Sequence, residues 1–485
     1  MSVLNHKIPF ERYFEEISQI PRCSGNEAAL SNYLVDFAKK HGLQYDQDPA
    51  GNVIIFKLPS PGYENSPTVI LQAHMDMVCE KDPDCEHDFS KDPLQLYLEG
   101  PENNILRARG TTLGADDGMG VAQQLAILAN NTSPHPALEC VFTVEEENGM
   151  RGAAVFDYSK LSGRLMITLD CGQEENSIVA SCGGMSVVIK KNFSIVPLKG
   201  KVAAFKVNGL LGGHSGIVVN QERGNAIKLA GRVLCELLYG DIDLNLVAIN
   251  GGSKHNIVPK ECSVVFACPE EQMAKAQLII KRTADDIKNE LRASDSGFYL
   301  QIMELVKANG EMFSGADSKK IVALIEILPN DVYRRSVKYE GVVTASNCLS
   351  VIKTTASKVE VYTSIRAQTD ALLCDLYHKI DLSAKALNFE TKTLNRYPCW
   401  PFKEDSMLRD RVDQLMQRLW NKSLKGRRVH GGLEAGYFAA NLPGIEIIGI
   451  GPYCGEVHTT REWLDVRSAH RVYRFLLTLL AEMKE

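Results

Sequence analysis

The chain has 485 residues, of which 45% are hydrophobic, 24% charged and 7% aromatic. This composition excludes a disordered or fibrous protein, and the length suggests two to four domains of about 100–200 residues. The net charge of −6 is spread along the chain and favours neither nucleic-acid nor anionic-membrane binding. No apolar run approaches the ~20 residues of a membrane-spanning helix, and charged residues stand where a signal peptide would have its apolar core. Thirteen cysteines, never spaced as CxxC, predict reduced thiols in a cytoplasmic protein.

Helices and strands alternate through the first part of the chain. A helix is predicted at 10–20, a second helix begins after Asn26 as its N-cap, and an Ala-rich helix covers 119–128. Strands are predicted at 52–56, 68–72, 138–143 and 165–169. Several of these strands are continuously apolar, as expected of strands that are buried on both faces of a sheet. The alternation predicts an α/β layer architecture.

The pattern changes at about residue 187, where strands with charged residues begin. Strands are predicted at 187–193, 202–207, 246–250, 263–267, 351–354 and 359–366, with helices at 226–238, 270–292 and 371–385. The stretch 308–390 is a weak second copy of the stretch before it. We interpret the two stretches as two similar βαβ-type halves, although two unrelated units of this kind can resemble each other by chance.

The α/β pattern returns after residue 395, with a helix at 406–420, a strand at 445–450 and a helix at 469–483. A two-copy segment between two α/β pieces suggests an insertion into one domain. We therefore expect a catalytic domain with a central mixed β-sheet, formed by 1–186 and 396–485, and an inserted α+β lid domain at 187–395.

The residues that could take part in catalysis or metal binding lie at strand ends. In AHMDMV, His74 and Asp76 follow an apolar strand, and residues two apart in an extended chain point to the same side. A carboxylate beside an imidazole fixes its tautomer and raises its basicity as a metal ligand. Further acids and a histidine lie in RGTTLGADDGMG, VFTVEEENGMRG, LMITLDCG and GPYCGEVHTTREW, namely Asp116, Asp117, Glu145, Glu146, Glu147, Asp170 and His458.

Each of these segments, taken singly, also has a purely structural interpretation. Acids at a helix start are ordinary capping residues, and a run of glutamates is an ordinary solvated turn. Together the segments place His, Asp, Glu, Asp and His in order at strand ends, where open α/β sheets bind their ligands. Oxygen and imidazole ligands without thiolates suit Zn²⁺, Mn²⁺ or Co²⁺, and two such ions can share a bridging carboxylate.

On these motifs the sequence resembles the co-catalytic di-zinc peptidases, a family that includes carnosinases, aminoacylases and bacterial dipeptidases. The match continues in order through GGHSG, HNIVP, SIRAQ, HGGLEAG and GPYCGEVH, so it covers nearly the whole chain. Within the family, the length and the motifs are most like the bacterial aminoacyl-histidine dipeptidases. The resemblance implies a zinc-peptidase domain and an inserted lid that supplies substrate contacts.

The resemblance also implies the roles of the metal-site residues. His74 and Asp170 would hold one ion, Glu147 and His458 would hold the other, and Asp116 would bridge the two. Asp76 would orient His74, and Asp117 would not be a ligand. A cis peptide bond between Asp116 and Asp117 is implied as well.

Glu146 would be the general base, which takes a proton from the attacking water and delivers it to the leaving amine. The family pattern is Glu-Glu-x-Gly, and Gly149 sets its register. The extra Glu145 stands where relatives often carry Asp or Thr.

In the inserted segment, the resemblance implies that His214 polarises the scissile carbonyl or stabilises its oxyanion. Asn256, Arg366 and the backbone of Gly432 would hold the C-terminal carboxylate of the substrate, for which an Arg fork is suited.

The expected function is metal-dependent hydrolysis of unmodified dipeptides, of the aminoacyl-histidine (Xaa-His) type and with broad specificity as an option. The cofactors would be two divalent metal ions, zinc first and manganese or cobalt as alternatives. The expected partner is a small peptide substrate, with no nucleic acid and no membrane, and the chain would be a monomer or a homodimer. An N-acyl amino-acid deacylase and a tripeptide aminopeptidase are the alternatives on the same metal site. The complete ligand set and Glu146 argue against a non-catalytic binding protein.

Overall fold

The computed structural model describes residues 2–304 and 310–484, and the chain divides into two compact units. Unit 1 comprises Met1–Ser181, Trp400–Val429 and Leu433–Glu485, and unit 2 comprises Cys182–Cys399 and His430–Gly432. We predicted a catalytic domain at 1–186 and 396–485 and a lid at 187–395. This assignment is a statement about function as well as about compact units, and it stays a prediction. Among the described helices, none combines the length and the apolar composition that crossing a membrane requires.

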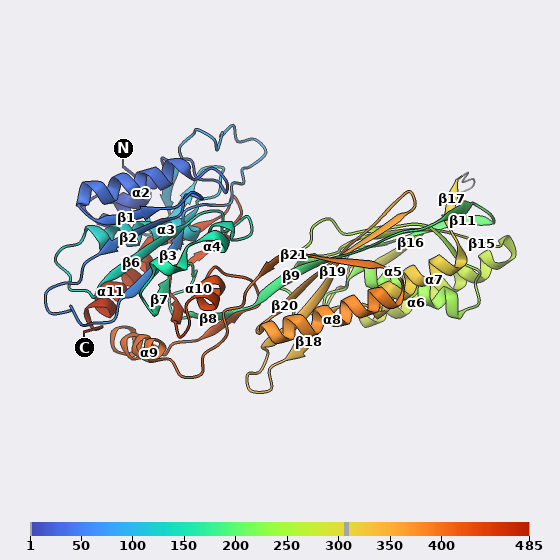
Figure 1. The fold of residues 1–485 in the computed structure, drawn as a ribbon. Coiled ribbons are helices and arrows are strands. Elements are labelled where there is room, and N and C mark those ends of the chain that lie inside the picture. The colour runs from blue at the N-terminus through green and yellow to red at the C-terminus, as the bar shows by residue number, and fades with distance from the viewer. Residues whose placement is uncertain (1, 305–309, 485) are drawn as a thin grey trace. The chain divides into compact units, whose positions relative to one another are not determined.

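An eight-stranded sheet forms the centre of unit 1 (Figure 1). Its strands lie in the order β1 (Gln44–Gln47), β2 (Val53–Lys57), β6 (Leu138–Thr143), β3 (Val69–His74), β7 (Leu165–Thr168), β23 (Glu446–Gly449), β8 (Ile178–Ser181) and β22 (Arg427–Val429). β3 runs parallel to β6 and β7, whereas β2 pairs antiparallel with β1 and β6. The sheet is therefore mixed, as predicted, and the carboxyl ends of β6, β3 and β7 meet at one edge.

Helices cover both faces of this sheet because alternate strand residues enter two different apolar cores. Val53 and Val69 belong to the larger core, and Ile54 and Ile70 belong to the smaller one. The larger core takes residues from α1 (Pro9–Ile17), α2 (Ala28–His41), α3 (Ala115–Ala129), α9 (Met407–Trp420) and α11 (Val466–Ala481). The smaller core takes residues from α10 (Ala435–Asn441) and the 3₁₀ turn Tyr158–Lys160, and α4 (Arg151–Val155) packs beside α10.

A second, four-stranded sheet in unit 1 was not predicted. Its antiparallel strands are β24 (Cys454–Gly455), β25 (Trp463–Asp465), β5 (Ile105–Ala108) and β4 (Leu96–Glu99). Strands of two to four residues are too short to show a hydrophobic period in the sequence. The loop between β24 and β25 carries His458.

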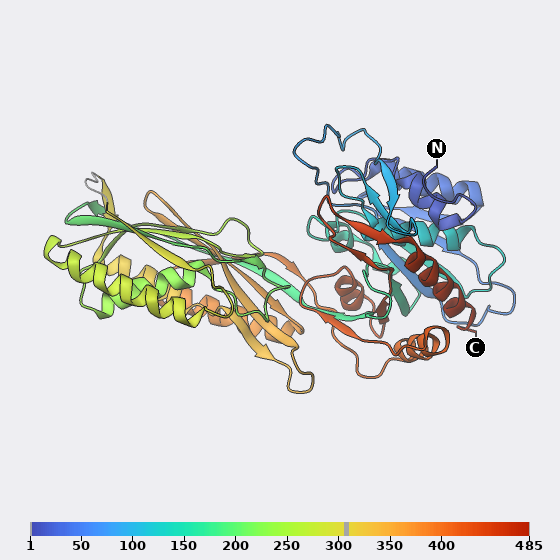
Figure 2. The ribbon, with the colours of Figure 1, turned by 180° about the vertical axis from the view of Figure 1, so that it is seen from behind.

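Unit 2 is built on a nine-stranded antiparallel sheet. The strand order is β16 (Tyr299–Glu304), β11 (Lys201–Asn208), β15 (Cys262–Cys268), β13 (Asn245–Gly251), β19 (Val343–Thr355), β20 (Lys358–Ala367), β9 (Gly183–Asn192) and β21 (Glu390–Tyr397), with β18 (Asp331–Arg335) beside β19. Four helices lie on one face of the sheet and share its core: α5 (Ala226–Tyr239), α6 (Met273–Glu290), α7 (Gly315–Ile327) and α8 (Asp370–Ala386) (Figures 1 and 2). The smaller elements are the strand pairs β10 (Ile195–Pro197) with β17 (Glu311–Phe313) and β12 (Gly213–His214) with β14 (Ile257–Val258), and the 3₁₀ turn Glu270–Gln272.

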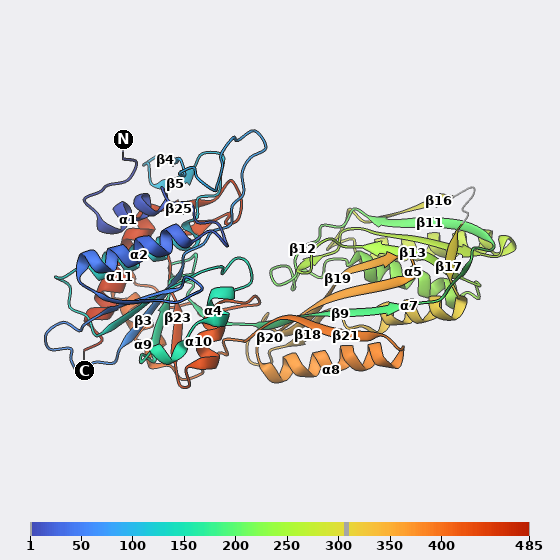
Figure 3. The same ribbon diagram turned by 45° about the horizontal axis from the view of Figure 1, so that its top comes forward.

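The strand order of unit 2 contains two halves with the same βαββαβ plan, which Figure 3 displays along the sheet. One half consists of β11, α5, β13, β15, α6 and β16, and the other consists of β9, α7, β19, β20, α8 and β21. Two similar halves were predicted, but their division along the chain was not. β9 was expected to open the first copy, yet it pairs with β20 and β21 and belongs to the second half, because the first half is inserted after it. The first two residues of the predicted copy 308–390 lie outside the described residues.

Two local predictions were wrong. Asn26 is not the N-cap of α2, because the chain still turns there: its N–H donates to the Cys23 carbonyl, and Glu27 occupies the cap position. The prediction of reduced thiols fails for Cys23 and Cys79, which the structure joins in a disulfide with a Cα–Cα distance of 5.7 Å. These residues are 56 positions apart and meet because the chain at Cys23 pairs with Met77 after β3, a contact that cysteine spacing does not reveal. The other 11 cysteines are free thiols.

Candidate functional site

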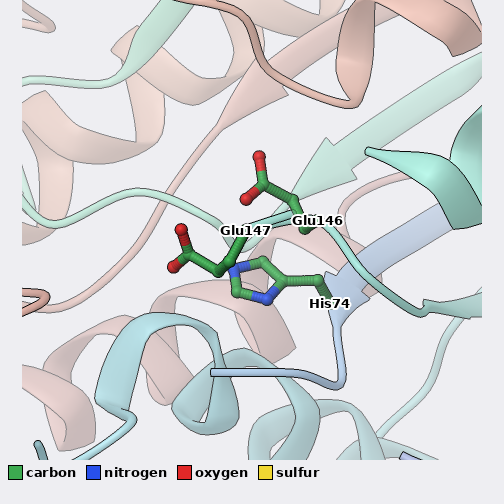
Figure 4. Close-up of side chains that lie close together, drawn as sticks. All are labelled: His74, Glu146 and Glu147. Atoms are coloured by element: carbon green, nitrogen blue, oxygen red, sulfur yellow. The ribbon is translucent and has the colours of Figure 1, made fainter. Parts of the chain in front are cut away.

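Three neighbouring strands of unit 1 end at the same sheet edge, and predicted metal-site residues follow each of them. His74 is the last residue of β3, and Asp76 lies two positions later. Glu146 and Glu147 follow β6, and Asp170 follows β7. Because β6 and β7 run parallel to β3 on either side of it, these side chains converge, and Figure 4 shows His74 with both glutamates.

Asp116 and His458 reach the same place from other elements. Asp116 lies in a kink at the start of α3, where the bond to Asp117 is cis, as the resemblance implied. Its Oδ1 is 3.3 Å from Nε2 of His74, and its Oδ2 is 3.4 Å from Nε2 of His458. The same nitrogen of His458 is 2.7 Å from Oε1 of Glu147. Asp116 therefore presents its two oxygens to two different histidines.

The potential ligand atoms form three groups, and within each group they lie within 4.8 Å of one another. The groups are His74, Asp116 and Asp170; Asp116, Glu147 and His458; and His74, Glu146 and Glu147. Two of the groups share Asp116, which is what a carboxylate between two cations requires. Imidazole and carboxylate donors in this arrangement fit divalent ions such as Zn²⁺.

The electrostatics of the cluster show that it carries an excess of negative charge. Burial, followed by repulsion from Asp116, raises the pKa of Asp170 to about 7. Hydrogen bonds to Asp116 and Glu147 raise the pKa of His458 to about 10. Burial opposes charge on His74, yet the hydrogen bonds to Asp116 and Asp76 raise its pKa well above the ordinary value. Bound cations would relieve this repulsion, which is a second reason why the site fits metal ions.

Asp76 accepts hydrogen bonds from the loop of potential metal ligands and belongs to none of the three ligand groups. Its Oδ1 is 3.3 Å from Nδ1 of His74 and accepts the backbone N–H of Glu146 at 3.0 Å. Its Oδ2 accepts the N–H of Glu147 at 3.1 Å and the hydroxyl of Ser24 at 2.7 Å. One buried carboxylate thus orients an imidazole and the loop that carries two glutamates.

The structure separates the three consecutive glutamates. Glu145 is turned toward Arg151, whose Nη1 donates to it at 2.9 Å, and it belongs to none of the three ligand groups. Glu146 is half-buried beside His74 and Glu147, and desolvation raises its pKa well above the ordinary value. Asp117 is also buried and accepts the N–H of Gly120 at 3.2 Å, so it lies beside the ligand groups without belonging to them.

The predicted substrate-binding residues lie in unit 2, and two of them, His214 and Arg366, belong to a second cluster of polar side chains. Nη2 of Arg366 is 3.3 Å from Nε2 of His214, and Nη1 donates to the Tyr397 hydroxyl at 3.0 Å. His430 lies nearby between Ser346 and Cys182, at 2.7 Å from Oγ and 3.2 Å from Sγ. Burial, with the positive charge of Arg366, lowers the pKa of His430 to about 4, so this histidine is neutral.

The other two predicted substrate residues are less tightly placed. The carbonyl of Asn256 accepts the N–H of Ser215 at 2.8 Å, which puts Asn256 beside His214, but its side chain is exposed. Gly432 follows His430 by two residues and is half-buried in the HGGLEAG turn. The structure thus brings His214 and Arg366 into contact and leaves Asn256 and Gly432 at the margin.

Several polar residues around the two clusters were not singled out from the sequence. Glu434 accepts hydrogen bonds from Thr143 and from Nε2 of Gln72, and burial raises its pKa to about 8. Glu462 accepts the backbone N–H groups of Leu113, Gly114, Ala115 and Asp116 at 2.8–3.3 Å. Tyr397, His430 and Arg22 complete this set. His430, Glu434 and Glu462 lie within the quoted motifs HGGLEAG and GPYCGEVHTTREW, but their partners are distant in sequence, so the motifs alone do not reveal these contacts.

The fold and the candidate metal-ligand groups are typical of a metal-dependent hydrolase. A sequence profile of peptidase family M20/M25/M40 matches residues 70–482, and the chain belongs to this family of metal-dependent peptide-bond hydrolases. The membership confirms the peptidase family and the α/β fold with an inserted domain that were predicted from the motifs.

Individual relatives agree with this membership. The chain is 32% identical to the cytosol non-specific dipeptidase of Escherichia coli (strain K12) over 479 residues, 98% of this chain and 97% of the relative. It is similar to the crystal structure of an aminoacylhistidine dipeptidase from Vibrio alginolyticus, with a TM-score of 0.90 and 31% identity, covering 100% of this chain and 98% of that one. The aminopeptidase PepT from Bacillus cereus, at a TM-score of 0.57 and 15% identity over the full length of both chains, shares the fold.

Proposed function

We propose that this peptidase hydrolyses unmodified dipeptides with two divalent metal ions, zinc first and manganese or cobalt as alternatives. The observation that carries the proposal is Asp116, whose two oxygens face His74 on one side and His458 on the other. The names of the two full-length relatives, a non-specific dipeptidase and an aminoacylhistidine dipeptidase, support dipeptides as substrates. We expect broad specificity that includes C-terminal histidine.

The metal ions would be held by the two ligand groups that share Asp116. His74, Asp116 and Asp170 would hold one ion, and Asp116, Glu147 and His458 would hold the other. When bound, such ions lower the pKa of water and polarise the scissile carbonyl.

Glu146 would be the general acid–base. It lies beside His74 and Glu147, and it would take a proton from the attacking water and release it to the leaving amine. Asp76 keeps Glu146 in place through the backbone N–H and keeps His74 in one orientation. Glu145, engaged with Arg151, takes no part.

The unit 2 cluster would recognise the free carboxylate of the substrate. Arg366 supplies a planar fork of donors. His430 beside it is neutral and bonded to Ser346, so it does not compete with the substrate carboxylate for Arg366. His214, in contact with Arg366, would polarise the scissile carbonyl, and Asn256 and Gly432 would complete the contacts. Recognition of the carboxylate one residue beyond the scissile bond would restrict the substrates to dipeptides.

A substrate panel tests the proposed function. The purified, zinc-loaded protein is assayed with Ala-His, Ala-Ala, Ala-Ala-Ala and N-acetyl-alanine, and products are separated by chromatography. We expect turnover of both dipeptides and slow or no turnover of the other two. Preferred cleavage of the tripeptide would favour the aminopeptidase alternative, and preferred cleavage of the acetylated amino acid would favour the deacylase.

We also propose a cytoplasmic location, which is supported by the description of the Escherichia coli relative as cytosolic and by the 11 free cysteines. The Cys23–Cys79 bond is the feature that does not fit a reducing compartment. Alkylation of thiols in rapidly quenched cells, followed by mass spectrometry of the Cys23 peptide, shows whether Cys23 is reduced or disulfide-bonded in the cell. A reduced Cys23 would agree with a cytoplasmic location. The expectation of a monomer or a homodimer is open to light scattering.

A further inference from the structure

Arg22 is among the largest fully buried side chains of the described residues, and the proposed mechanism does not use it. A buried guanidinium is unfavourable unless its donors find acceptors and its charge finds partners. Burial lowers the pKa of Arg22 to about 10, still well above neutral pH, and the carboxylates of Glu462, Asp76 and Asp117 oppose this effect. Arg22 is therefore a fixed positive charge in an acidic surrounding.

The guanidinium joins two loops that carry metal-site residues. Nη1 donates to the carbonyls of Met75 at 3.0 Å and Asp76 at 3.2 Å, in the loop that follows His74. Nη2 donates to the carbonyl of Gly114 at 2.5 Å, two residues before Asp116. One planar group thus spans the backbone next to His74 and the backbone next to Asp116.

The Asp116 loop is shaped around this side chain. A Cβ atom at Gly114 or Gly118 would collide with Nη2 of Arg22, which explains why the motif GADDGMG has glycine at both positions. From its other side the loop is held by Glu462, which accepts the N–H groups of Gly114 and Ala115 at 2.9 Å each. Carbonyl and amide groups of the same loop are therefore anchored by opposite charges.

The segment around Arg22 reaches the third ligand loop as well. Ser24 donates to Asp76 at 2.7 Å, and Oε1 of Glu27 accepts the N–H of Glu145 at 3.0 Å. The disulfide between Cys23 and Cys79 ties the same segment to the chain beyond β3. Of these residues, Arg22 is the one that contacts both loops that flank the potential metal ligands His74 and Asp116.

We propose that Arg22 is a positioning residue of the metal centre, which sets the separation of His74 and Asp116 through three backbone carbonyls. The inference rests on the metal site of the proposed function and is independent of the substrate. Lysine cannot replace arginine here, because an ammonium is a point charge on a flexible stem and cannot span three acceptors in a plane.

The test compares Arg22→Lys with the wild type by metal affinity, measured in competition with a chromophoric chelator. We expect the zinc affinity to fall by about 10- to 100-fold, the usual effect of removing a group that orients metal ligands. The visible spectrum of the cobalt-loaded variant should shift, and kcat should fall with little change in KM, because the unit 2 cluster is untouched. The matched control is Arg164→Lys, which alters an arginine that donates to the carbonyls of Ser162 and Gly163, away from the ligand loops, and should behave like the wild type.

Circular dichroism establishes whether the variant folds. If Arg22→Lys does not fold, Arg22→Met, which removes the charge and keeps an unbranched apolar stem, is measured in its place, with added guanidinium ion as the rescuing group. Wild-type zinc affinity and an unchanged cobalt spectrum in a folded variant would overturn the inference, as would failure of both variants to fold, since Arg22 would then serve folding. A wild type that binds no metal would instead overturn the proposed function.

Discussion

Unit 1 and unit 2 each contain a cluster of histidines and charged residues, and the histidines of the two clusters have opposite pKa shifts. In unit 1, Asp116 and Glu147 raise the pKa of His458 to about 10. In unit 2, burial and the nearby Arg366 lower the pKa of His430 to about 4. The first surrounding favours a positive charge on the imidazole and the second disfavours it, so the same residue type lies in two opposite electrostatic settings. The comparison teaches that a motif alone does not predict whether its histidine is charged, because the neighbouring side chains set the direction of the pKa shift.

Removing the metal ions tests the cationic side of the comparison and has the largest expected effect. After exhaustive chelation, dipeptide hydrolysis should fall to background, and two zinc equivalents per chain should restore it. Elemental analysis of the restored protein counts the ions. Full activity in chelated protein with no residual metal would break the comparison, because unit 1 would then not be a cation site.

Glu146→Ala separates proton transfer from metal binding within unit 1. We expect kcat to fall by about 10²–10⁴-fold, the usual contribution of a general base, with the metal content nearly intact. Glu147→Ala should lose metal as well, since Glu147 contacts His458. Glu145→Ala is the control, because its carboxylate is paired with Arg151 outside the cluster. An inactive Glu145→Ala beside an active Glu146→Ala would show that the register is wrong by one residue.

Arg366→Ala tests the anionic side of the comparison. The metal content should stay unchanged while kcat/KM for a dipeptide falls by roughly 30-fold to several-thousand-fold, the range for truncating one partner of a buried charge pair. The wild type should reject the C-terminal amide of the same dipeptide, and the variant should discriminate much less between acid and amide. Arg396→Ala is the control on β21, another strand of the same sheet, since Arg396 is exposed and approaches Asp370 no closer than 4.0 Å. Equal wild-type turnover of the acid and the amide would remove Arg366 from substrate recognition.

The pH dependence of stability gives the smallest effect and sharpens the contrast between the histidines. His430 has a folded pKa of about 4 against an ordinary value of 6.5, so the folded state favours the neutral imidazole. The contribution of the neutral His430 imidazole to the free energy of unfolding is therefore fully present above pH 6.5. As the pH falls toward 4, this free energy decreases by at most about 3 kcal/mol. The groups that face it are Ser346, Cys182 and Arg366. Thermal unfolding between pH 7 and pH 4 should show a smaller acid-induced drop for His430→Gln than for the wild type, and parallel curves would contradict the assignment.

The sequence was sufficient where a local pattern coincides with a structural necessity. Residues that directly follow apolar parallel strands must gather at one sheet edge, so the proximity of His74 and Asp170 could be predicted from the sequence. The sequence was insufficient where a residue acts through distant backbone. Arg22 and Gly114 are 92 positions apart and Glu462 and Leu113 are 349 apart, and nothing near them in the sequence announces either contact. The short strands β24 and β25 were missed for a related reason, because their pairing, not their composition, makes them strands.

The two ends of the unit 2 insertion lie side by side. In unit 1, Ser181 and Trp400 exchange backbone hydrogen bonds at 3.0 and 3.1 Å, and in unit 2, Gly184 pairs with Tyr397. The span that the backbone of unit 1 must bridge at this point is thus one strand spacing, whatever the length of the chain in between. Because loop-closure entropy rises only slowly with loop length, insertion of more than 200 residues here adds little to the entropic cost of closing unit 1. Recombination at these two adjacent points of the chain would therefore exchange residues 182–399 while leaving the eight-stranded sheet of unit 1 intact, and the His430–Gly432 segment of unit 2, which comes from a later part of the chain, would stay in place.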